Sequence, residues 1–185
     1  MPLDTRAFWF LRHGETDWNA RNLSQGNVDI PLNPIGVAQA SRAALALRDR
    51  GLRSVISSTL SRARDTAEAV AGPLGLSVTL DDGLREVAFG VQEGQPMAEW
   101  FEDWIDGTFT PEGAESFADL RVRAVAAVNR ALSKQAPVLV VAHGALFRAI
   151  RAEMGLSPEV RTPNATPYLC EPGDPWTLTA AELPA

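Results

Sequence analysis

The sequence has little cysteine and little histidine, and it has no long hydrophobic run. Its single cysteine, Cys170, excludes an internal disulfide, favours a reducing compartment and is most simply a small buried apolar side chain. Its two histidines and scattered carboxylates make a poor transition-metal site, so neither a metal nor another cofactor is expected. No apolar run approaches the roughly 20 residues of a membrane-spanning helix, and no signal-peptide pattern is visible. We therefore expect a cytoplasmic protein that does not insert into membranes.

An excess of positive charge is also missing. The 185 residues carry 17 Lys and Arg against 23 Asp and Glu, which gives a net charge of −6. This balance argues against nucleic acid and anionic membranes as general partners. A small phosphorylated substrate stays compatible, because a few local arginines can reverse the field inside a cleft. The length predicts a single domain over residues 1–185, and it leaves a homodimer open.

Short apolar runs alternate with segments of helical periodicity. Strands are expected at 7–11, 54–57, 78–80 and 138–141, and two further β-like runs at 167–171 and 176–180 flank a turn signal. Helices are expected at 35–50, 61–71, about 97–106, 116–134 and 144–153, with Asn33 and Ser61 as N-caps of the first two. A polar loop is expected at 19–34 and an irregular connection at 83–94. The alternation predicts an α/β fold with three layers, in which a mostly parallel sheet is flanked by helices.

Both histidines lie where an apolar run ends, and a glycine follows each of them. Residues 7–11 lead into Arg12-His13-Gly14, and residues 138–142 lead into His143-Gly144. The carboxyl ends of parallel strands gather into one crevice, so we expect the two imidazoles to face each other across one site. Gly14 is expected to let the backbone turn and pass close to a ligand. The alternative is that both are hydrogen-bonded core histidines, which is the usual fate of a lone histidine.

Two more segments carry groups suited to phosphate chemistry. Arg62 lies in the first turn of an expected helix, where the helix N-terminus favours anions and a forked guanidinium suits phosphate. Without that context, Arg62 would be a solvated helix residue like Arg64. The segment Leu84 to Gly94, LREVAFGVQEG, is a loop that holds the carboxylate of Glu86, the aromatic ring of Phe89 and two glycines.

These motifs together resemble the histidine phosphatase superfamily, the fold shared by cofactor-dependent phosphoglycerate mutase and many small phosphatases. The resemblance covers residues 12 to about 165. It rests on RHGETDWN, on LSRA with the following TAE, on LREVAFGVQEG and on AHG, in that order. Residues 113–116 also resemble the Gly-Glu-Ser that opens a long helix in this family. The resemblance implies a phosphoglycerate mutase-like fold, with a flap at about 86–115.

The resemblance also implies a role for each matching residue. His13 would be the nucleophile that accepts the phosphoryl group, and Glu86 would donate a proton to the leaving oxygen. The three equatorial phosphoryl oxygens would be bound by Arg12, Arg62 and His143. Further substrate-binding residues would be Asn19, Thr16, Gln25, Gly26, Phe89, Gly144 and Ala145.

Elementary chemistry asks for the same division of labour. Phosphoryl transfer needs fixed positive charge around the transferred group. A histidine nucleophile must be neutral at the attacking nitrogen, so its other ring nitrogen should donate to a carbonyl near the Gly14 turn. General acid help to an alkoxide leaving group is worth about 10²–10⁴ in rate. The apolar neighbours of Glu86 would favour its protonated form by desolvation, although a loop carboxylate is often simply solvated.

The segment 86–120 bears on the substrate. It holds nine Asp or Glu residues and no Lys or Arg, whereas mutases of this family hold a second anionic group with basic residues there. Phe89 also stands where the mutase pattern has a tyrosine. An acidic flap would repel a phosphoglycerate carboxylate. We therefore expect a metal-independent phosphatase that passes the phosphohistidine to water, and a small metabolite with an apolar, neutral or cationic leaving group.

Three alternatives stay open at this point. One is phosphoglycerate mutase activity. The second is a phosphatase for phosphorylated proteins, including phosphohistidine. The third is an inactive module that binds phosphate through the same pocket, although such modules tend to lose the nucleophile, an arginine or the acid, and all are present here.

Overall fold

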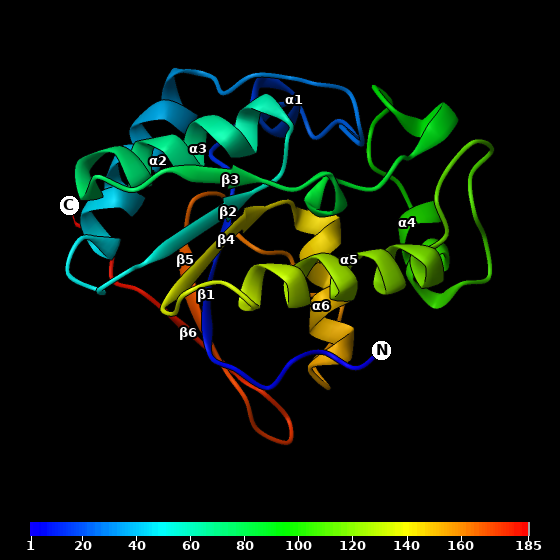
Figure 1. Ribbon diagram of the computed structural model, residues 1–185. Coiled ribbons are helices and arrows are strands. Elements are labelled where there is room, and N and C mark those ends of the chain that lie inside the picture. Colours follow the sequence, from blue (N-terminus) through cyan, green and yellow to red (C-terminus); the bar gives the residue numbers. More distant parts are fainter. Residues whose placement is uncertain (185) are drawn as a thin grey trace.

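A six-stranded sheet forms the centre of the computed structural model, which describes residues 1–184 (Figure 1). Its strands are β1 (Phe8–Arg12), β2 (Ser54–Ser57), β3 (Val78–Leu80), β4 (Val138–Ala142), β5 (Pro167–Glu171) and β6 (Thr177–Ala180). The spatial order is β3-β2-β4-β1-β5-β6. The first four strands are parallel, β5 pairs antiparallel with β1, and β6 pairs antiparallel with β5. This confirms the predicted α/β architecture with a mostly parallel sheet.

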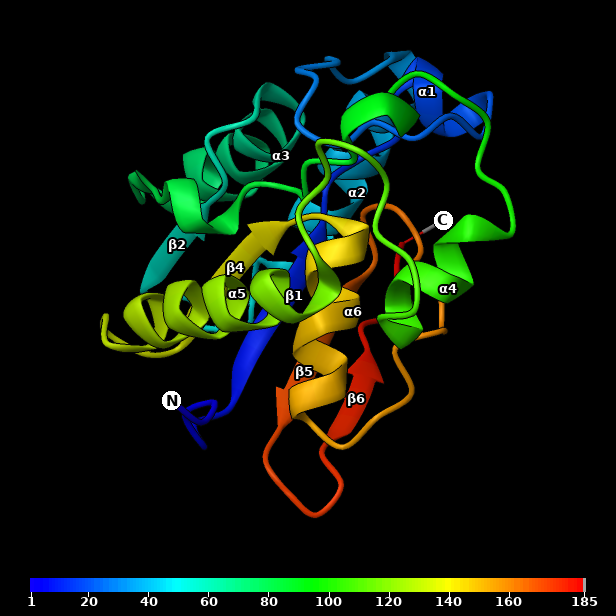
Figure 2. The same ribbon diagram turned by 90° about the vertical axis from the view of Figure 1, so that its right-hand side faces the viewer.

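Helices cover both faces of the sheet. The longer helices are α2 (Pro34–Leu47), α3 (Ser61–Ala71), α5 (Phe117–Leu132) and α6 (Gly144–Glu153). The pair α2 and α3 covers one face and the pair α5 and α6 covers the other (Figures 1 and 2). Each face holds its own buried apolar cluster.

Strand β1 shows why its sequence is apolar throughout. Successive side chains of a strand point to opposite faces, and both faces here are covered. Phe8 and Phe10 pack in the cluster under α5 and α6, whereas Trp9 and Leu11 pack in the cluster under α2 and α3. The ring of Phe10 stacks on Phe147 of α6 with centroids 3.7 Å apart.

The predicted elements are present, with shifts at several ends. The bounds of β2, β3, β5, α3 and α6 agree with the prediction. Helix α2 ends at Leu47, and α5 runs from 117 to 132 with Ser116 as its N-cap, whose side chain accepts a hydrogen bond from the Asp119 N–H. Asn33 caps α2 as predicted, through a hydrogen bond from the Gly36 N–H.

Two local predictions were wrong. Ser61 does not cap α3: the N-cap is Leu60, and the Ser61 hydroxyl bonds the carboxylate of Asp29 instead. The expected loop 19–34 overlaps a short helix, α1 (Asp17–Ala20), which begins in a capping box made by Thr16 and Asn19. The capping-box pattern of Thr16 and Asn19 is visible in the sequence, but both residues belong to the RHGETDWN motif, which was attributed to the site.

The segment 86–115 is irregular apart from one short helix, α4 (Trp100–Asp106), and a 3₁₀ turn at Gly90–Gln92. Two more 3₁₀ turns lie outside it, at Gly72–Leu74 and Asp82–Leu84. The Trp104 side chain is fully buried and its indole N–H donates to the Glu115 carbonyl. The flap and single-domain predictions stay predictions. Within residues 1–184, no helix is long and apolar enough to cross a membrane.

Candidate active site

Three neighbouring parallel strands end at one edge of the sheet, and each is followed by a polar residue. His13 follows β1, His143 follows β4, and Ser58 follows β2, in the part of the sheet where the order is β2-β4-β1. The centroids of the two imidazoles lie 5.2 Å apart. The expectation that both histidines meet at one site is confirmed, because parallel strands bring their carboxyl ends together.

His13 is 98% buried, since only 2% of its surface is exposed, and its ring is oriented by its own chain. The Nδ1 atom lies 2.7 Å from the Gly14 carbonyl oxygen. A carbonyl can only accept, so Nδ1 carries the proton and Nε2 keeps its lone pair. Burial, followed by the positive charges of Arg62 and Arg12, holds the pKa of His13 well below its usual value. The neutral imidazole is therefore the favoured form, as the nucleophile chemistry requires.

Arg12 and Arg62 bring two buried guanidinium groups to the same place. Arg12 donates from Nη1 to the Thr162 carbonyl at 2.7 Å. Arg62 donates from Nη1 and Nη2 to the carbonyls of Val28 and Gly26, both at 2.8 Å. Burial lowers the pKa of each arginine to about 10, so both stay charged at neutral pH. Arg62 thus has a structural task that the sequence did not reveal, because it also holds the loop at 26–28.

His143 is fully buried and is held by Ser58. Its Nε2 atom lies 2.7 Å from Ser58 Oγ, which already accepts a hydrogen bond from the Leu60 N–H. A Ser58 hydroxyl that donates to Nε2 makes Nδ1 the protonated nitrogen of a neutral ring. Burial, followed by the charge of Arg62, lowers the pKa of His143 well below its usual value. Nδ1 then serves as a neutral N–H donor.

Three buried nitrogen atoms of these side chains have no hydrogen-bond partner among residues 1–184. They are Arg12 Nε, Arg62 Nε and His143 Nδ1. Buried polar atoms are normally paired, so three unpaired nitrogens on neighbouring side chains require an explanation. All three belong to residues that the family resemblance assigns to phosphoryl oxygens. A tetrahedral oxyanion beside His13 would satisfy them.

Glu86 lies at the N-terminus of α6. Its Oε2 accepts from the Ala145 N–H at 3.0 Å, and its Oε1 accepts from the N–H groups of Leu146 and Val87 at 2.9 and 3.1 Å. These three donors and the helix dipole stabilise the charged carboxylate. The expected apolar surroundings are therefore only part of the environment of Glu86.

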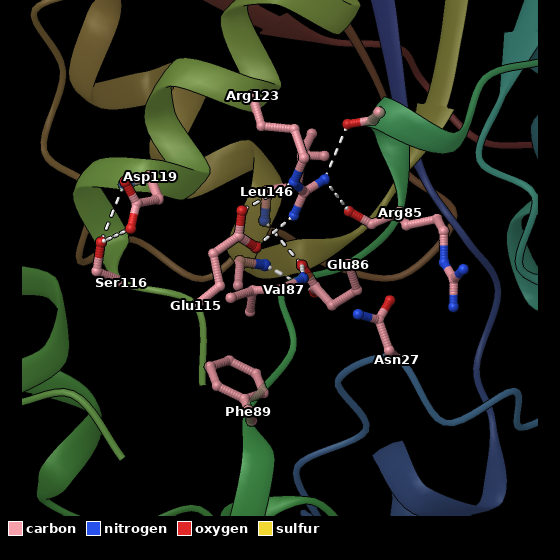
Figure 3. A network of polar contacts seen from close by, with 12 residues as sticks. Asn27, Arg85, Glu86, Val87, Phe89, Glu115, Ser116, Asp119, Arg123 and Leu146 are labelled. Atoms are coloured by element: carbon pink, nitrogen blue, oxygen red, sulfur yellow. Dashed lines mark hydrogen bonds and ion pairs between the residues drawn. The ribbon is translucent and has the colours of Figure 1, made fainter. Parts of the chain in front are cut away.

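A clamp of Arg123 and Glu115 holds the Glu86 loop against α5 (Figure 3). Arg123 forms a bidentate ion pair with Glu115, with distances of 2.9 Å from Nε and 2.6 Å from Nη2. Its Nη1 donates to the carbonyls of Gly83 and Arg85, at 2.9 and 2.8 Å, and Arg85 directly precedes Glu86. The Glu115 N–H also donates to the Ala88 carbonyl at 2.9 Å. The Gly113–Ser116 motif thus contributes both half of this clamp and the N-cap of α5.

The glycines of the two histidine motifs leave room for different neighbours. A Cβ on Gly144 would lie 3.3 Å from Arg12 Nε, so this glycine does make room for a group of the site. A Cβ on Gly14 would lie 2.4 Å from the Gly36 carbonyl oxygen of α2. The close approach that Gly14 allows is therefore to α2, and its approach to a ligand stays a prediction.

A cavity of about 250 Å³ opens above these groups. Of the predicted site residues, those that line it are Arg12, His13, Asn19, Gln25, Gly26, Glu86, Phe89, Gly144 and Ala145. Arg62 and His143 are fully buried and lie outside the lining. Thr16 does not line the cavity either: its fully buried hydroxyl donates to the Gln25 side chain at 2.6 Å, and its role as a substrate-binding residue stays a prediction.

Several residues near the site were given no role in it from the sequence. Asn164 Nδ2 donates to the carbonyl of His13 at 2.9 Å, and Thr66 Oγ1 accepts from the Gly14 N–H at 3.0 Å. The position of Ser58 directly after a strand was a usable signal, because His13 and His143 hold the same position. Arg148 and Arg161 line the cavity but lie outside every motif.

The charge of the cavity differs from the expectation. Of the nine acidic residues in 86–120, only Glu86 lines it, together with three arginines, Arg12, Arg148 and Arg161. Other acids of the segment have local partners: Glu115 pairs with Arg123, and Glu93 accepts from the N–H groups of Asn27 and Phe89. The argument that an acidic flap would repel an anionic leaving group therefore fails. Phe101 of α4 also lines the cavity.

No group of three or more His, Cys, Asp or Glu side chains within residues 1–184 is arranged to hold a metal ion. Cys170 is buried, and burial raises the pKa of its thiol well above the usual range.

Comparisons with known proteins agree with this geometry. The model of the histidine phosphatase superfamily (branch 1) matches residues 8–165. The uncharacterised phosphatase PhoE of Bacillus subtilis is 35% identical over 158 residues, which cover 84% of this chain and 81% of PhoE. The probable phosphoglycerate mutase GpmB of Yersinia pestis is 38% identical over 148 residues, which cover 74% of this chain and 68% of GpmB. A mycobacterial glucosyl-3-phosphoglycerate phosphatase, solved in complex with VO3, superposes with a TM-score of 0.83 at 31% identity, covering 97% of this chain and all of that one.

Proposed function

This chain belongs to the histidine phosphatase superfamily, and within that family we propose a metal-independent phosphomonoester hydrolase. Its relatives support a phosphatase. We propose that it works through a phosphohistidine intermediate on a small phosphorylated metabolite. The observation that carries the proposal is the set of three unpaired buried nitrogens, on Arg12, Arg62 and His143, beside the free Nε2 of His13. The VO3 complex of the mycobacterial relative supports it, since vanadium oxyanions imitate phosphoryl groups.

In the first step, His13 Nε2 attacks phosphorus and the ester P–O bond breaks. The Nδ1 proton stays on the hydrogen bond to Gly14, which stabilises the positive charge that develops on the ring. The side chains of Arg12, Arg62 and His143 donate to the phosphoryl oxygens. Protonated Glu86 gives its proton to the leaving oxygen as the P–O bond breaks.

In the second step, water attacks the phosphohistidine. Glu86, now a carboxylate, accepts a proton from the water, the N–P bond breaks, and His13 regains its lone pair as inorganic phosphate forms. The three backbone donors to Glu86 suit this step, because they stabilise the carboxylate that acts as the base. The same residue serves as acid and then as base, which closes the cycle.

The proposal that no metal takes part rests on the donor set. Arg12 and Arg62 are permanently charged and buried beside the nucleophile, so they supply the positive charge that phosphoryl transfer demands. Turnover in excess EDTA tests this directly. The proposed enzyme should keep its activity when EDTA removes free metal ions, whereas a metal-dependent enzyme would lose it.

Phosphoglycerate mutase activity is the second candidate, since GpmB carries that name. Phe89 lacks the hydroxyl of the mutase pattern, which favours hydrolysis. Incubation with 3-phosphoglycerate and catalytic 2,3-bisphosphoglycerate separates the two activities. Release of inorganic phosphate supports the hydrolase, and formation of 2-phosphoglycerate without phosphate release contradicts it.

The remaining alternatives are separable by substrate and by variant. Phosphopeptides compared with small phosphomonoesters test the phosphoprotein phosphatase. An inactive binding module would bind phosphate equally well as wild type and as His13→Ala, with no turnover by either. We also propose a cytoplasmic location and a small-molecule substrate, with no nucleic acid or membrane as partner. A homodimer is compatible with the proposal.

The deciding experiment is a panel of phosphorylated metabolites with EDTA present, run with wild type, His13→Ala and Glu86→Ala. We expect hydrolysis by wild type and none by His13→Ala. We expect Glu86→Ala to impair alkyl esters more than p-nitrophenyl phosphate, whose leaving group scarcely needs a proton. Full activity of His13→Ala would overturn the proposal.

A further inference from the structure

Two arginines line the cavity without any part in the chemistry proposed above. Arg148 extends from α6, and Arg161 lies in the connection between α6 and β5. Neither forms an ion pair with a carboxylate among residues 1–184, in contrast to Arg123 and Arg130, which pair with Glu115 and Asp81. An unpaired arginine at the wall of a cavity is available to a ligand.

Arg148 is held in place by neutral partners. Its Nη1 donates to the carbonyls of Pro158 and Glu159, at 2.8 and 2.5 Å. The guanidinium also lies over the ring of Phe101, 5.0 Å from its centroid, within the range of a cation–π contact. These contacts fix the position of the guanidinium without an ion pair to a carboxylate, so the group is preorganised for an anion.

Arg161 is close enough to act electrostatically on both other arginines of the cavity. Burial lowers the pKa of Arg148, the charge of Glu86 opposes this, and the charge of Arg161 lowers it further. The charge of Arg161 likewise acts to lower the pKa of Arg12, after burial and against Glu86. This mutual repulsion is relieved when an anion binds between them.

We propose that Arg148 and Arg161 form a subsite for a second anionic group, a carboxylate or a phosphate, on the leaving group of the substrate. This inference rests on the proposed phosphatase function and names its substrate class. The lining of the cavity also includes three apolar side chains, Phe89, Phe101 and Met97. The substrate is therefore a compact phosphomonoester whose alcohol portion carries an acidic group on the α6 side.

A matched substrate pair tests the subsite. 3-Phosphoglycerate and glycerol 3-phosphate differ in whether the terminal carbon is a carboxylate or a hydroxymethyl group. One charge-assisted arginine contact predicts a preference of about 10- to 100-fold in kcat/KM for the acidic substrate. Propane-1,3-diol bisphosphate against 3-hydroxypropyl phosphate is the corresponding pair for a second phosphate, and the larger ratio identifies the anion.

Variants tie the preference to the two arginines. Arg161→Gln is at an exposed position, and it should reduce the preference ratio at least about fivefold. Arg148→Gln should do the same. The matched control is Arg151→Gln, one turn along α6, where Nε donates to the Ser157 carbonyl at 2.8 Å and the side chain does not line the cavity. The control should keep the wild-type ratio.

A ratio near one in wild type, or equal ratios in wild type and both variants, would overturn the subsite even if the enzyme is active. Calorimetric binding of the same substrate pair to His13→Ala provides a reading that needs no turnover. Preferential binding of the acidic compound, lost on adding Arg161→Gln, supports the subsite even if hydrolysis of every substrate fails. Equal binding of both compounds contradicts it.

Discussion

The two ends of the cavity are built on different principles. The phosphate end stands on the carboxyl ends of β1, β2 and β4, and its side chains are buried and fixed by hydrogen bonds to the backbone and to Ser58. The other end, which we propose holds the leaving group, is here called the leaving-group end. It is assembled from segments far apart in the sequence, namely the Phe89–Phe101 region, Arg148 of α6 and Arg161. A rigid end suits chemistry that is common to a family, and an end made of loops suits a specificity that differs between members.

The largest effect should follow a change at the centre of the phosphate end. We expect His13→Ala to lose at least about 10⁴-fold in kcat, as is typical when a covalent nucleophile is removed. Phosphate should still bind, because Arg12, Arg62 and His143 remain. Steady-state hydrolysis of p-nitrophenyl phosphate and calorimetric titration with phosphate measure the two quantities. If His13→Ala lowered the affinity for phosphate as much as it lowered kcat, His13 would not have a catalytic role separate from phosphate binding.

The next effect concerns the residue between the two ends. Glu86→Gln keeps the shape of the side chain but cannot supply a proton, so we expect a loss of about 10²–10⁴ in kcat for alkyl phosphates. Aryl phosphates with an acidic leaving group should lose far less. A plot of rate against leaving-group pKa should therefore be steeper for the variant. Parallel plots for variant and wild type would exclude Glu86 as the general acid.

A smaller effect should come from the clamp behind Glu86. Arg123→Ala frees the carbonyls of Gly83 and Arg85, so the Glu86 loop loses its attachment to α5. We expect about a tenfold loss for alkyl phosphates, in line with one lost charged hydrogen-bond network, and little change for p-nitrophenyl phosphate. Arg121→Ala is the matched control on the same helix, since Arg121 pairs with Glu153 instead. Equal losses on both substrates would indicate a purely structural role.

The smallest effect is on stability, and it again concerns the phosphate end. His143 is buried with a pKa well below its usual value, so the unfolded chain takes up a proton below about pH 6.5 that the folded chain does not. Stability is therefore lost as the pH falls below that value. We expect His143→Gln to flatten this dependence by about 1.4 kcal/mol per pH unit between pH 6 and 5. Urea unfolding at several pH values measures it, and an unchanged slope would contradict neutral burial.

The sequence was informative where function depends on strand ends. The apolar runs before His13 and His143 predicted both the strands and the meeting of the two imidazoles, because parallel strands end at one edge. Helix ends marked by Asn33 and Ser116 were similarly readable. Local patterns thus predicted the fold and most of the phosphate end.

The leaving-group end could not be predicted in the same way. The acidic residues of 86–120 were counted correctly, but only the fold shows that all of them except Glu86 lie outside the cavity lining and that Glu115 pairs with Arg123. Arg148 and Arg161 reach the cavity through tertiary packing, and no spacing in the sequence links them to His13. Thr16 shows the converse, since a residue inside the strongest motif serves to cap a helix and hold Gln25.

The central claim is that the His13 imidazole carries the phosphoryl group for part of each cycle. Rapid quenching of the enzyme with a ³²P-labelled phosphomonoester, followed by proteolysis and mass spectrometry, tests it most directly. The account predicts an acid-labile, base-stable label on the peptide that contains His13, formed at up to one phosphate per chain and absent from His13→Ala. Steady hydrolysis without any labelled peptide, or a label on another residue, would contradict it.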